Sequence, residues 1–153
     1  MSDERMSDER VGDERVGDEG HDAGMKVRRA VLGDAHVDRA IERTTEFTAP
    51  FQEFITRYAW GGAWTREGLD RRTRSVITLS VLTALGRENE IAMHVRAALR
   101  NGLTPAEIGE VFIHTAIYAG VPAANSAFAI AQEVIEAESA PGGLADPAGA
   151  DSD

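Results

Sequence analysis

The sequence contains no cysteine, and this absence excludes several kinds of chemistry at once. Disulfide bonds, zinc sites built from thiolates and a cysteine nucleophile all need a residue that the chain does not have. No apolar run approaches the ~18 residues that a membrane-spanning helix needs. The N-terminal residues are charged rather than apolar, which is not the pattern of a secretory signal. We therefore expect a cytoplasmic protein whose chemistry does not use thiols.

Lysine is almost as scarce, and the charge is unevenly distributed along the chain. The formal net charge is −10. Residues 1–24 contain nine acids and three arginines, and residues 139–153 contain three acids and no base. Residues 25–138 are nearly neutral, with twelve arginines and the single lysine, Lys26, against fourteen acids. Because the chain has no basic block, nucleic acid is not an expected partner. The many arginines instead suit planar recognition of carboxylates.

Sustained strand alternation is also missing, and helical spacing dominates the central residues. The first twenty residues repeat a five-residue unit (MSDER, MSDER, VGDER, VGDEG) that has too little apolar surface to fold by itself. We predict disordered tails at 1–24 and 139–153, on either side of one helical domain at 25–138. This domain is expected to be all-α, a compact bundle of about six helices.

Capping residues predict where these helices begin and end. Asp34 is expected to cap a short helix, and Asp70 a longer one that ends before Gly86. Thr104 and Glu107 form a capping box, with proline between them at the first helical position. The sequence thus predicts helices over about 34–43, from 50 to a break at 60–64 (WGGAW), and over about 70–85, 88–100, 104–120 and 122–138.

One of these helices has too much apolar surface for a small domain. The segment from Val76 to Leu85 is apolar on nearly every side and must be covered on several of them. A body of 114 residues has little interior available. Subunit interfaces are the natural place for the surplus, so we expect a homo-oligomer.

Glu90 and His94 are the first candidates for chemistry. At helical pitch they lie on one face, one turn apart, so the carboxylate can orient the imidazole as a general acid or base. The alternative is an ordinary surface pair at i,i+4, worth a few tenths of a kcal/mol. Metal binding would need a third ligand; His114 could supply it, but no motif requires one.

Arginines form the second candidate group. Arg71, Arg72 and Arg74 lie in the first turn of a predicted helix, where their charge opposes the helix dipole. Such a misfit is typical of sites that bind a ligand or a partner. With Arg57 and Arg96, they suit a substrate that bears carboxylates. The alternative is ion pairing with nearby acids or with a neighbouring subunit.

Aromatic side chains, only 6% of the residues, form the third group. Trp60, Trp64 and Tyr118 could line an apolar pocket while offering polar atoms to a ligand. Asn125 could donate a hydrogen bond into a pocket near the turn at 120–122, or it could cap backbone groups. For each aromatic taken singly, ordinary core packing is the alternative interpretation.

Four separated strings resemble one known family. They are GMKVRRAVLGDAHVDRA (24–40), FITRYAWGGAWTREGLDRRTRS (54–75), HVRAALRNG (94–102) and AIYAGVPAANSAF (116–128). In this order they resemble the carboxymuconolactone decarboxylase family over about residues 24–138. The resemblance implies an all-α fold of the alkylhydroperoxidase D type and a ring-shaped homo-oligomer, usually a hexamer. Peroxidase relatives carry a CxxC motif three residues before a histidine. Aligning that histidine with His94 places Arg87 and Glu90 at the cysteine positions, so the thiol peroxidase function is not expected.

The resemblance implies a carbon–carbon lyase. The expected reaction is cofactor-independent decarboxylation of a carboxylated muconolactone, in the degradation of protocatechuate and related aromatic acids. No metal or cofactor is required, because the ring of the substrate itself accepts the electrons. A non-decarboxylating relative, such as a small-molecule binding or stress protein, and a lactone hydrolase or isomerase are the alternatives.

The implied reaction gives each candidate residue a role. His94 is predicted to return a proton to the ring, with Glu90 orienting it. Arg72 and Arg74 are predicted to hold the substrate carboxylate, with Arg57 and Arg96 as further candidates. Trp60, Trp64 and Tyr118 are predicted to form the apolar walls.

Overall fold

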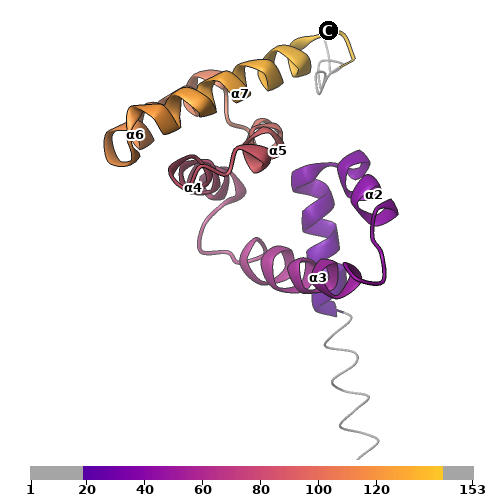
Figure 1. Ribbon diagram of the computed structural model, residues 1–153. Coiled ribbons are helices and arrows are strands. Elements are labelled where there is room, and N and C mark those ends of the chain that lie inside the picture. Colours follow the sequence, from indigo (N-terminus) through magenta and orange to yellow (C-terminus); the bar gives the residue numbers. More distant parts are fainter. Residues whose placement is uncertain (1–18, 143–153) are drawn as a thin grey trace, which may run out of the picture. The chain divides into compact units, whose positions relative to one another are not determined.

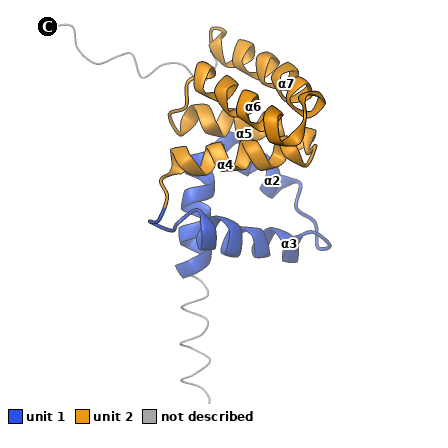
Figure 2. Ribbon diagram, turned by 90° about the vertical axis from the view of Figure 1, so that its left-hand side faces the viewer, with its two compact units in different colours: residues 1–68 blue, residues 69–153 orange. Residues whose placement is uncertain are grey.

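The computed structural model describes residues 19–142, and every regular element within them is a helix (Figure 1). The all-α prediction is therefore confirmed for this part of the chain. The chain divides into two compact units between Gly68 and Leu69 (Figure 2). The tails predicted at the two ends lie outside the described residues, except for residues 19–24 and 139–142. Within residues 19–142, no helix is both long and apolar enough to cross a bilayer.

Unit 1 begins with a helix over residues 19–32, so ordered structure starts before the boundary predicted at residue 25. It is followed by α2 (Asp34–Glu42), α3 (Ala49–Phe54) and the π-helix η1 (Ile55–Ala63). The position before α2 is occupied by Gly33, whose φ of 88° favours glycine. The prediction that Asp34 caps this helix is wrong, because Asp34 is already its first residue and its carboxylate accepts a hydrogen bond from Arg29 instead.

The predicted break at 60–64 is also wrong, because the chain continues helically through that segment as η1. A π-helix has a wider turn than an α-helix, and it is a rare element. The Trp64 N–H donates to the Ala59 carbonyl, five residues earlier, at 3.1 Å. The two glycines in this segment therefore do not end the helix.

A close approach of two backbones accounts for glycine at positions 61 and 24. A Cβ built on Gly61 would lie 2.5 Å from the carbonyl oxygen of Gly20. A Cβ built on Gly24 would lie 2.8 Å from the Gly61 nitrogen and would overlap the Thr56 carbonyl oxygen. The first helix therefore crosses η1 at a separation that only glycine permits. The composition of the charge-rich repeat that precedes Gly24 predicts disorder, so the packing of this helix could not be predicted from composition.

The described residues of unit 2 form four helices, and the ends predicted from capping residues are confirmed. The helices are α4 (Arg71–Ala84), α5 (Glu88–Arg100), α6 (Pro105–Ala119) and α7 (Val121–Ser139). Asp70 accepts a hydrogen bond from the Thr73 N–H at 2.7 Å, and Thr104 and Glu107 make both bonds of the capping box. Gly86 and Gly120 have φ of 69° and 102°, which favours glycine at both turns.

A single apolar core joins these four helices. Leu79 of α4, Ile91 and Val95 of α5, Phe112 of α6 and Ala127 of α7 are all almost fully buried in it. The Phe112 ring meets the Phe128 ring edge-on, with centroids 5.4 Å apart. Close packing of this kind fixes how α5 is oriented about its axis, because one helical face supplies most of its buried residues.

The glycine crossing in unit 1 leads to a stability prediction. Gly24→Ala should lower the free energy of unfolding by about 1–3 kcal/mol, because the new methyl group meets backbone atoms that cannot move aside easily. Gly20→Ala is the matched control on the same helix, since a Cβ there meets nothing within 4 Å. Urea denaturation followed by circular dichroism measures both. Equal stability of the two variants would contradict the close crossing.

Candidate active site

His94 lies on α5, at the border between the buried face of that helix and the solvent. Ile91, Val95 and Ala98 form the buried face at spacings of four and three residues. His94 directly precedes Val95, so its side chain is half-buried, and its Nδ1 atom is fully buried. The imidazole is therefore partly shielded from water while part of the ring stays accessible. That position suits a group that exchanges a proton with a bound ligand.

Glu90 lies one turn before His94, in the first turn of α5, and its side chain is exposed. It lines a surface hollow of about 360 Å³ together with residues 86–89. The helix dipole favours a carboxylate at this end. An exposed i,i+4 pair adds little stability, so any contribution of Glu90 to His94 would concern orientation and charge rather than folding.

His114, the possible third metal ligand, is exposed on α6, and its ring centroid lies 5.3 Å from that of Tyr118. Within residues 19–142, no three His, Asp or Glu side chains converge in the way that metal ligands do.

Three of the arginines predicted to bind substrate already contact a carboxylate of the chain. Arg57 donates to Glu53 at 2.7 Å, Arg96 lies 3.3 Å from Glu138, and Arg72 bonds Glu107. Arg74 is half-buried in the first turn of α4, and its Nε atom is fully buried. Arg71 is exposed. The positive charge of the first three arginines is thus offset within the chain.

The contact between Arg72 and Glu107 links the beginnings of α4 and α6. The hydrogen bond from Arg72, and then the bond from the Thr104 N–H, hold the pKa of the Glu107 carboxyl below its usual value. Asp70 behaves similarly, because the Thr73 backbone N–H lowers the pKa of its carboxyl. These acids therefore stay ionised and offset the cationic first turn of α4. Arg72 is therefore ion-paired, although its partner is Glu107 at the beginning of α6 and not an acid close to it in sequence.

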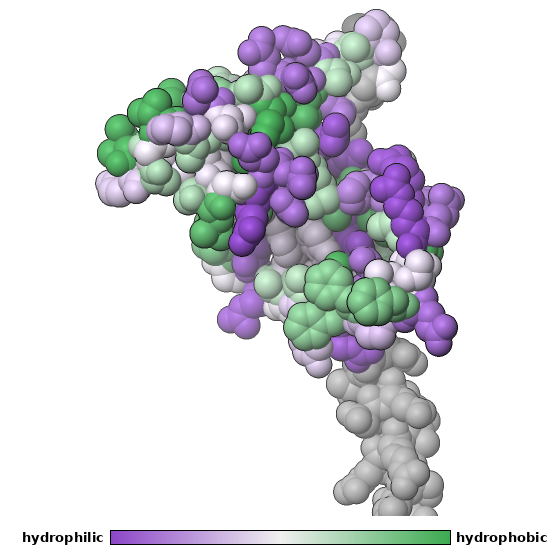
Figure 3. All heavy atoms as spheres, in the orientation of Figure 1, coloured by the Kyte–Doolittle hydropathy of each residue, from purple (hydrophilic) through white to green (hydrophobic). Residues whose placement is uncertain are grey.

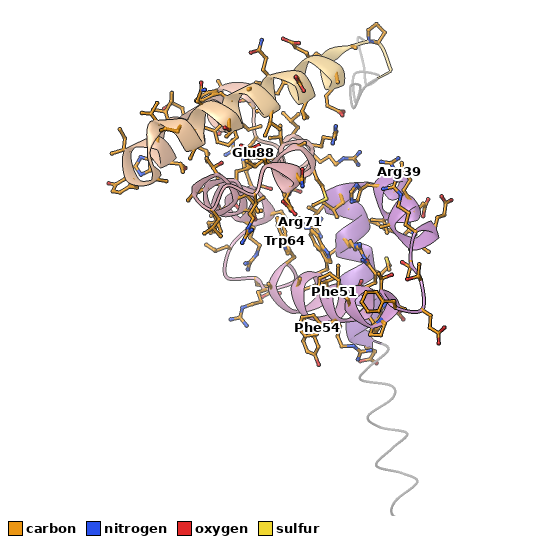
Figure 4. The ribbon with its side chains drawn as sticks, viewed as in Figure 1. Arg39, Phe51, Phe54, Trp64, Arg71 and Glu88 are labelled. Atoms are coloured by element: carbon orange, nitrogen blue, oxygen red, sulfur yellow. The ribbon has the colours of Figure 1, made fainter. Side chains whose placement is uncertain are left out.

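The predicted aromatic walls belong to different units. Trp60 is buried and Trp64 is half-buried at the end of η1 in unit 1, with ring centroids 5.3 Å apart (Figure 4). Tyr118 is on α6 and Asn125 near the beginning of α7, both exposed, in unit 2. Unit 2 also has an apolar cavity of about 320 Å³, lined by Ile108, Phe112, Phe128 and Ile135, among others.

Unit 1 contains a polar cavity that the sequence analysis did not predict. Its volume is about 380 Å³, and Arg28, Arg39 and Arg43 are among the side chains that line it. Arg28 is 5% exposed. A sequence signal for its burial exists, because Arg28 lies three and four residues from Val31, Leu32 and Gly24, on the packed face of the first helix. Arginine side chains are usually exposed to solvent, however, so the residue type alone predicts that Arg28 is exposed.

Comparison with known proteins shows to which family the chain is similar in sequence. The sequence pattern of the Carboxymuconolactone decarboxylase family matches residues 49–133. A 4-carboxymuconolactone decarboxylase from Acinetobacter baylyi is 50% identical over 113 residues, which cover 74% of this chain and 84% of the relative. The nitrosuccinic acid decarboxylase npaB from Metarhizium robertsii is 43% identical over 114 residues, covering 74% of this chain and 80% of the relative. A 4-carboxymuconolactone decarboxylase from Pseudomonas putida is 66% identical over 41 residues, covering 27% and 85%. The chain belongs to the carboxymuconolactone decarboxylase family.

Proposed function

We propose that this chain is a carboxy-lyase that converts 4-carboxymuconolactone into the β-ketoadipate enol-lactone in protocatechuate catabolism, without a cofactor. The observation that carries this proposal is the 50% identity, over most of both chains, to a relative named for that reaction. The half-buried His94 supports it, because the reaction needs a group that returns a proton to carbon. The cytoplasmic location expected from the sequence belongs to the same proposal.

The proposed reaction needs no cofactor to accept electrons. The carbon–carbon bond to the carboxylate breaks, CO₂ leaves, and the bonding electrons spread through the ring double bond onto the lactone carbonyl oxygen. The substrate thus forms a dienolate that it stabilises through its own ring. The protein must hold the remaining carboxylate, stabilise charge on the lactone oxygen and protonate a ring carbon.

His94 is the proton donor in this proposal, and Glu90 orients it. General acid catalysis of this kind contributes about 10²–10⁴-fold to a rate. Trp60, Trp64 and Tyr118 would form apolar walls around the ring, and Asn125 would donate a hydrogen bond. An apolar setting favours loss of the carboxylate, since a tight ion pair to the leaving group would stabilise the ground state. Arg57, Arg72, Arg74 and Arg96 are the arginines that the sequence analysis nominated for the carboxylate that remains.

The direct test is an assay of the purified chain. The lactone is generated in place from its cycloisomerase precursor, and released CO₂ is measured. Nitrosuccinate is the comparison substrate, because the nitrosuccinic acid decarboxylase matches an equal share of this chain. Opening of the lactone without release of CO₂ would favour a hydrolase, and no reaction would favour a binding protein.

Replacing the imidazole tests the proton donor. His94→Ala should lower kcat by about 10²–10⁴-fold, because the variant lacks the proposed proton donor. Helicity by circular dichroism and the sedimentation coefficient should stay unchanged. His114→Gln is the control, since His114 lies on a different helix and has no role in the proposal. Near-full activity of His94→Ala would exclude the assignment.

The role of Glu90 can be separated from that of a general surface charge. Glu88 and Glu90 are both exposed in the first turn of α5, so Glu88→Gln is a matched control for Glu90→Gln. An imidazole held in one orientation delivers its proton more readily than one that is free to turn. Glu90→Gln should therefore lower kcat, whereas Glu88→Gln should not. Equal kcat values for the two variants would contradict the orienting role.

We also propose that the chain assembles with itself, into the ring that the family resemblance implies, with a hexamer as the expected size. Exposed apolar side chains support assembly. Ile113 and Ile117, one turn apart on α6, are 52% and 78% exposed, and Val121, the first residue of α7, is 71% exposed. On α4, Ile77, Val81 and Leu85 repeat the spacing and are about half exposed. Patches of this kind mark interaction surfaces.

A charge on the α6 face should weaken that assembly. Ile117→Glu buries a carboxylate against an apolar partner and should shift the protein toward the 16.5 kDa monomer. Light scattering coupled to gel filtration measures the mass. Ala137→Glu, which adds the same charge at an exposed position late in α7, should leave the mass unchanged. An unaltered mass for Ile117→Glu would exclude this face from the interface.

A further inference from the structure

The polar cavity of unit 1 is lined by cations and neutral groups. The first helix, α2, α3 and the connection between α2 and α3 supply its walls. Besides the arginines, the Thr44 and Thr48 hydroxyls, the Gln52 amide and the His36 ring line it, and no described aspartate or glutamate does. Its volume of about 380 Å³ lies in the range of small-molecule sites. A cavity with this lining attracts an anion.

Arg28 is the buried cation of this cavity. Its Nη1 donates to the Thr56 hydroxyl at 3.1 Å, and its Nη2 donates to the Gln52 side-chain oxygen at 3.0 Å. Its Nε is buried and has no hydrogen-bond partner among the described residues. Both recorded partners are neutral, so no carboxylate in residues 19–142 offsets this buried charge. Burial, and then the neighbouring Arg29 cation, lower the pKa of the Arg28 guanidinium. A buried guanidinium in this state is stabilised by a bound anion.

Two exposed guanidinium groups are added at the C-terminal end of α2 by Arg39, which is labelled in Figure 4, and by Arg43. Neither forms an ion pair with any described carboxylate. Arg29 shows the contrast, since it contacts both Asp34 and Asp38 at 3.1 and 2.8 Å. The helix dipole explains cations at the end of α2, but it does not explain why the buried Arg28 lines the same cavity.

The distribution of partners separates two classes of arginine. Arg57, Arg72 and Arg96, which the sequence nominated for substrate binding, each contact a glutamate. The cavity arginines contact none within the described residues. An arginine that already holds a carboxylate has part of its charge and some of its N–H donors engaged, whereas the cavity arginines have no carboxylate partner among the described residues.

We propose that the cavity lined by Arg28, Arg39 and Arg43 binds the carboxylate group of a small organic acid. The proposal stands on the cavity of unit 1 alone and does not depend on the proposed function. The guanidinium groups act as the binding site for the carboxylate and take no part in proton transfer.

The test uses the full chain with Arg39→Gln and Arg43→Gln, singly and together. Both side chains are exposed, so the fold of unit 1 does not depend on them. Arg100→Gln is the matched control, an exposed arginine at the end of α5. Succinate, a stable dicarboxylate, serves as the probe in isothermal titration calorimetry. The double variant should bind succinate about tenfold more weakly, the loss expected for one charge-assisted contact. Arg100→Gln should bind it as the unaltered chain does.

Failure of the unaltered chain to bind succinate, or equal binding by the unaltered chain and the double variant, overturns the anion site. The proposed function is tested separately by release of CO₂, so its failure would leave the anion site in place.

Discussion

The contact between two helix backbones at Gly24 and Gly61 is the constraint on which unit 1 depends. Because neither position has a Cβ, the first helix lies against η1 closely enough for its backbone to meet the Thr56 carbonyl. One turn after Gly24, the Arg28 guanidinium then reaches the Thr56 hydroxyl and becomes buried. The cavity lined by arginines is thus a consequence of helix packing, and its charge follows from which side chain lies one turn beyond the glycine.

Unit 2 shows how much of such a fold can be predicted from sequence. Its helix ends were predictable because Asp70, Thr104 and Glu107 satisfy backbone groups within a few residues, so the signal is local. Unit 1 was less predictable because its decisive contact joins residues 37 positions apart. Glycines that fit a close crossing look, in sequence, like glycines that end a helix. The charged repeat beside Gly24 also favours disorder by composition, which moved the predicted domain boundary too far along the chain.

In the candidate site, too, contacts between residues far apart in the sequence could not be predicted. Sequence identifies arginines but not their partners, and a partner decides whether an arginine can bind a ligand. Arg57 and Glu53 are one helical turn apart, so that pair was open to prediction. Arg72 and Glu107 are separated by 35 positions, and only the packing of α4 against α6 brings them together. The face of α5 that carries His94 was predictable from apolar spacing, whereas its degree of exposure depended on the neighbouring helices. Apolar surface remains exposed in both units, and Figure 3 shows hydrophobic side chains gathered over α3, where Phe51 and Phe54 are exposed.

The π-helix also restricts how the chain tolerates changes in length. A π turn contains one more residue than an α turn, so loss of one residue between Ile55 and Ala63 could be absorbed by conversion to α-helical hydrogen bonding. Such a deletion, however, rotates everything beyond it by about 100°, the angle per residue of an α-helix. Gly61 would then leave the crossing, and a bulkier neighbour would turn toward Gly24. The contact between Gly24 and Gly61 therefore fixes the number of residues in η1. The backbone hydrogen bonds of this segment alone could form with one residue fewer.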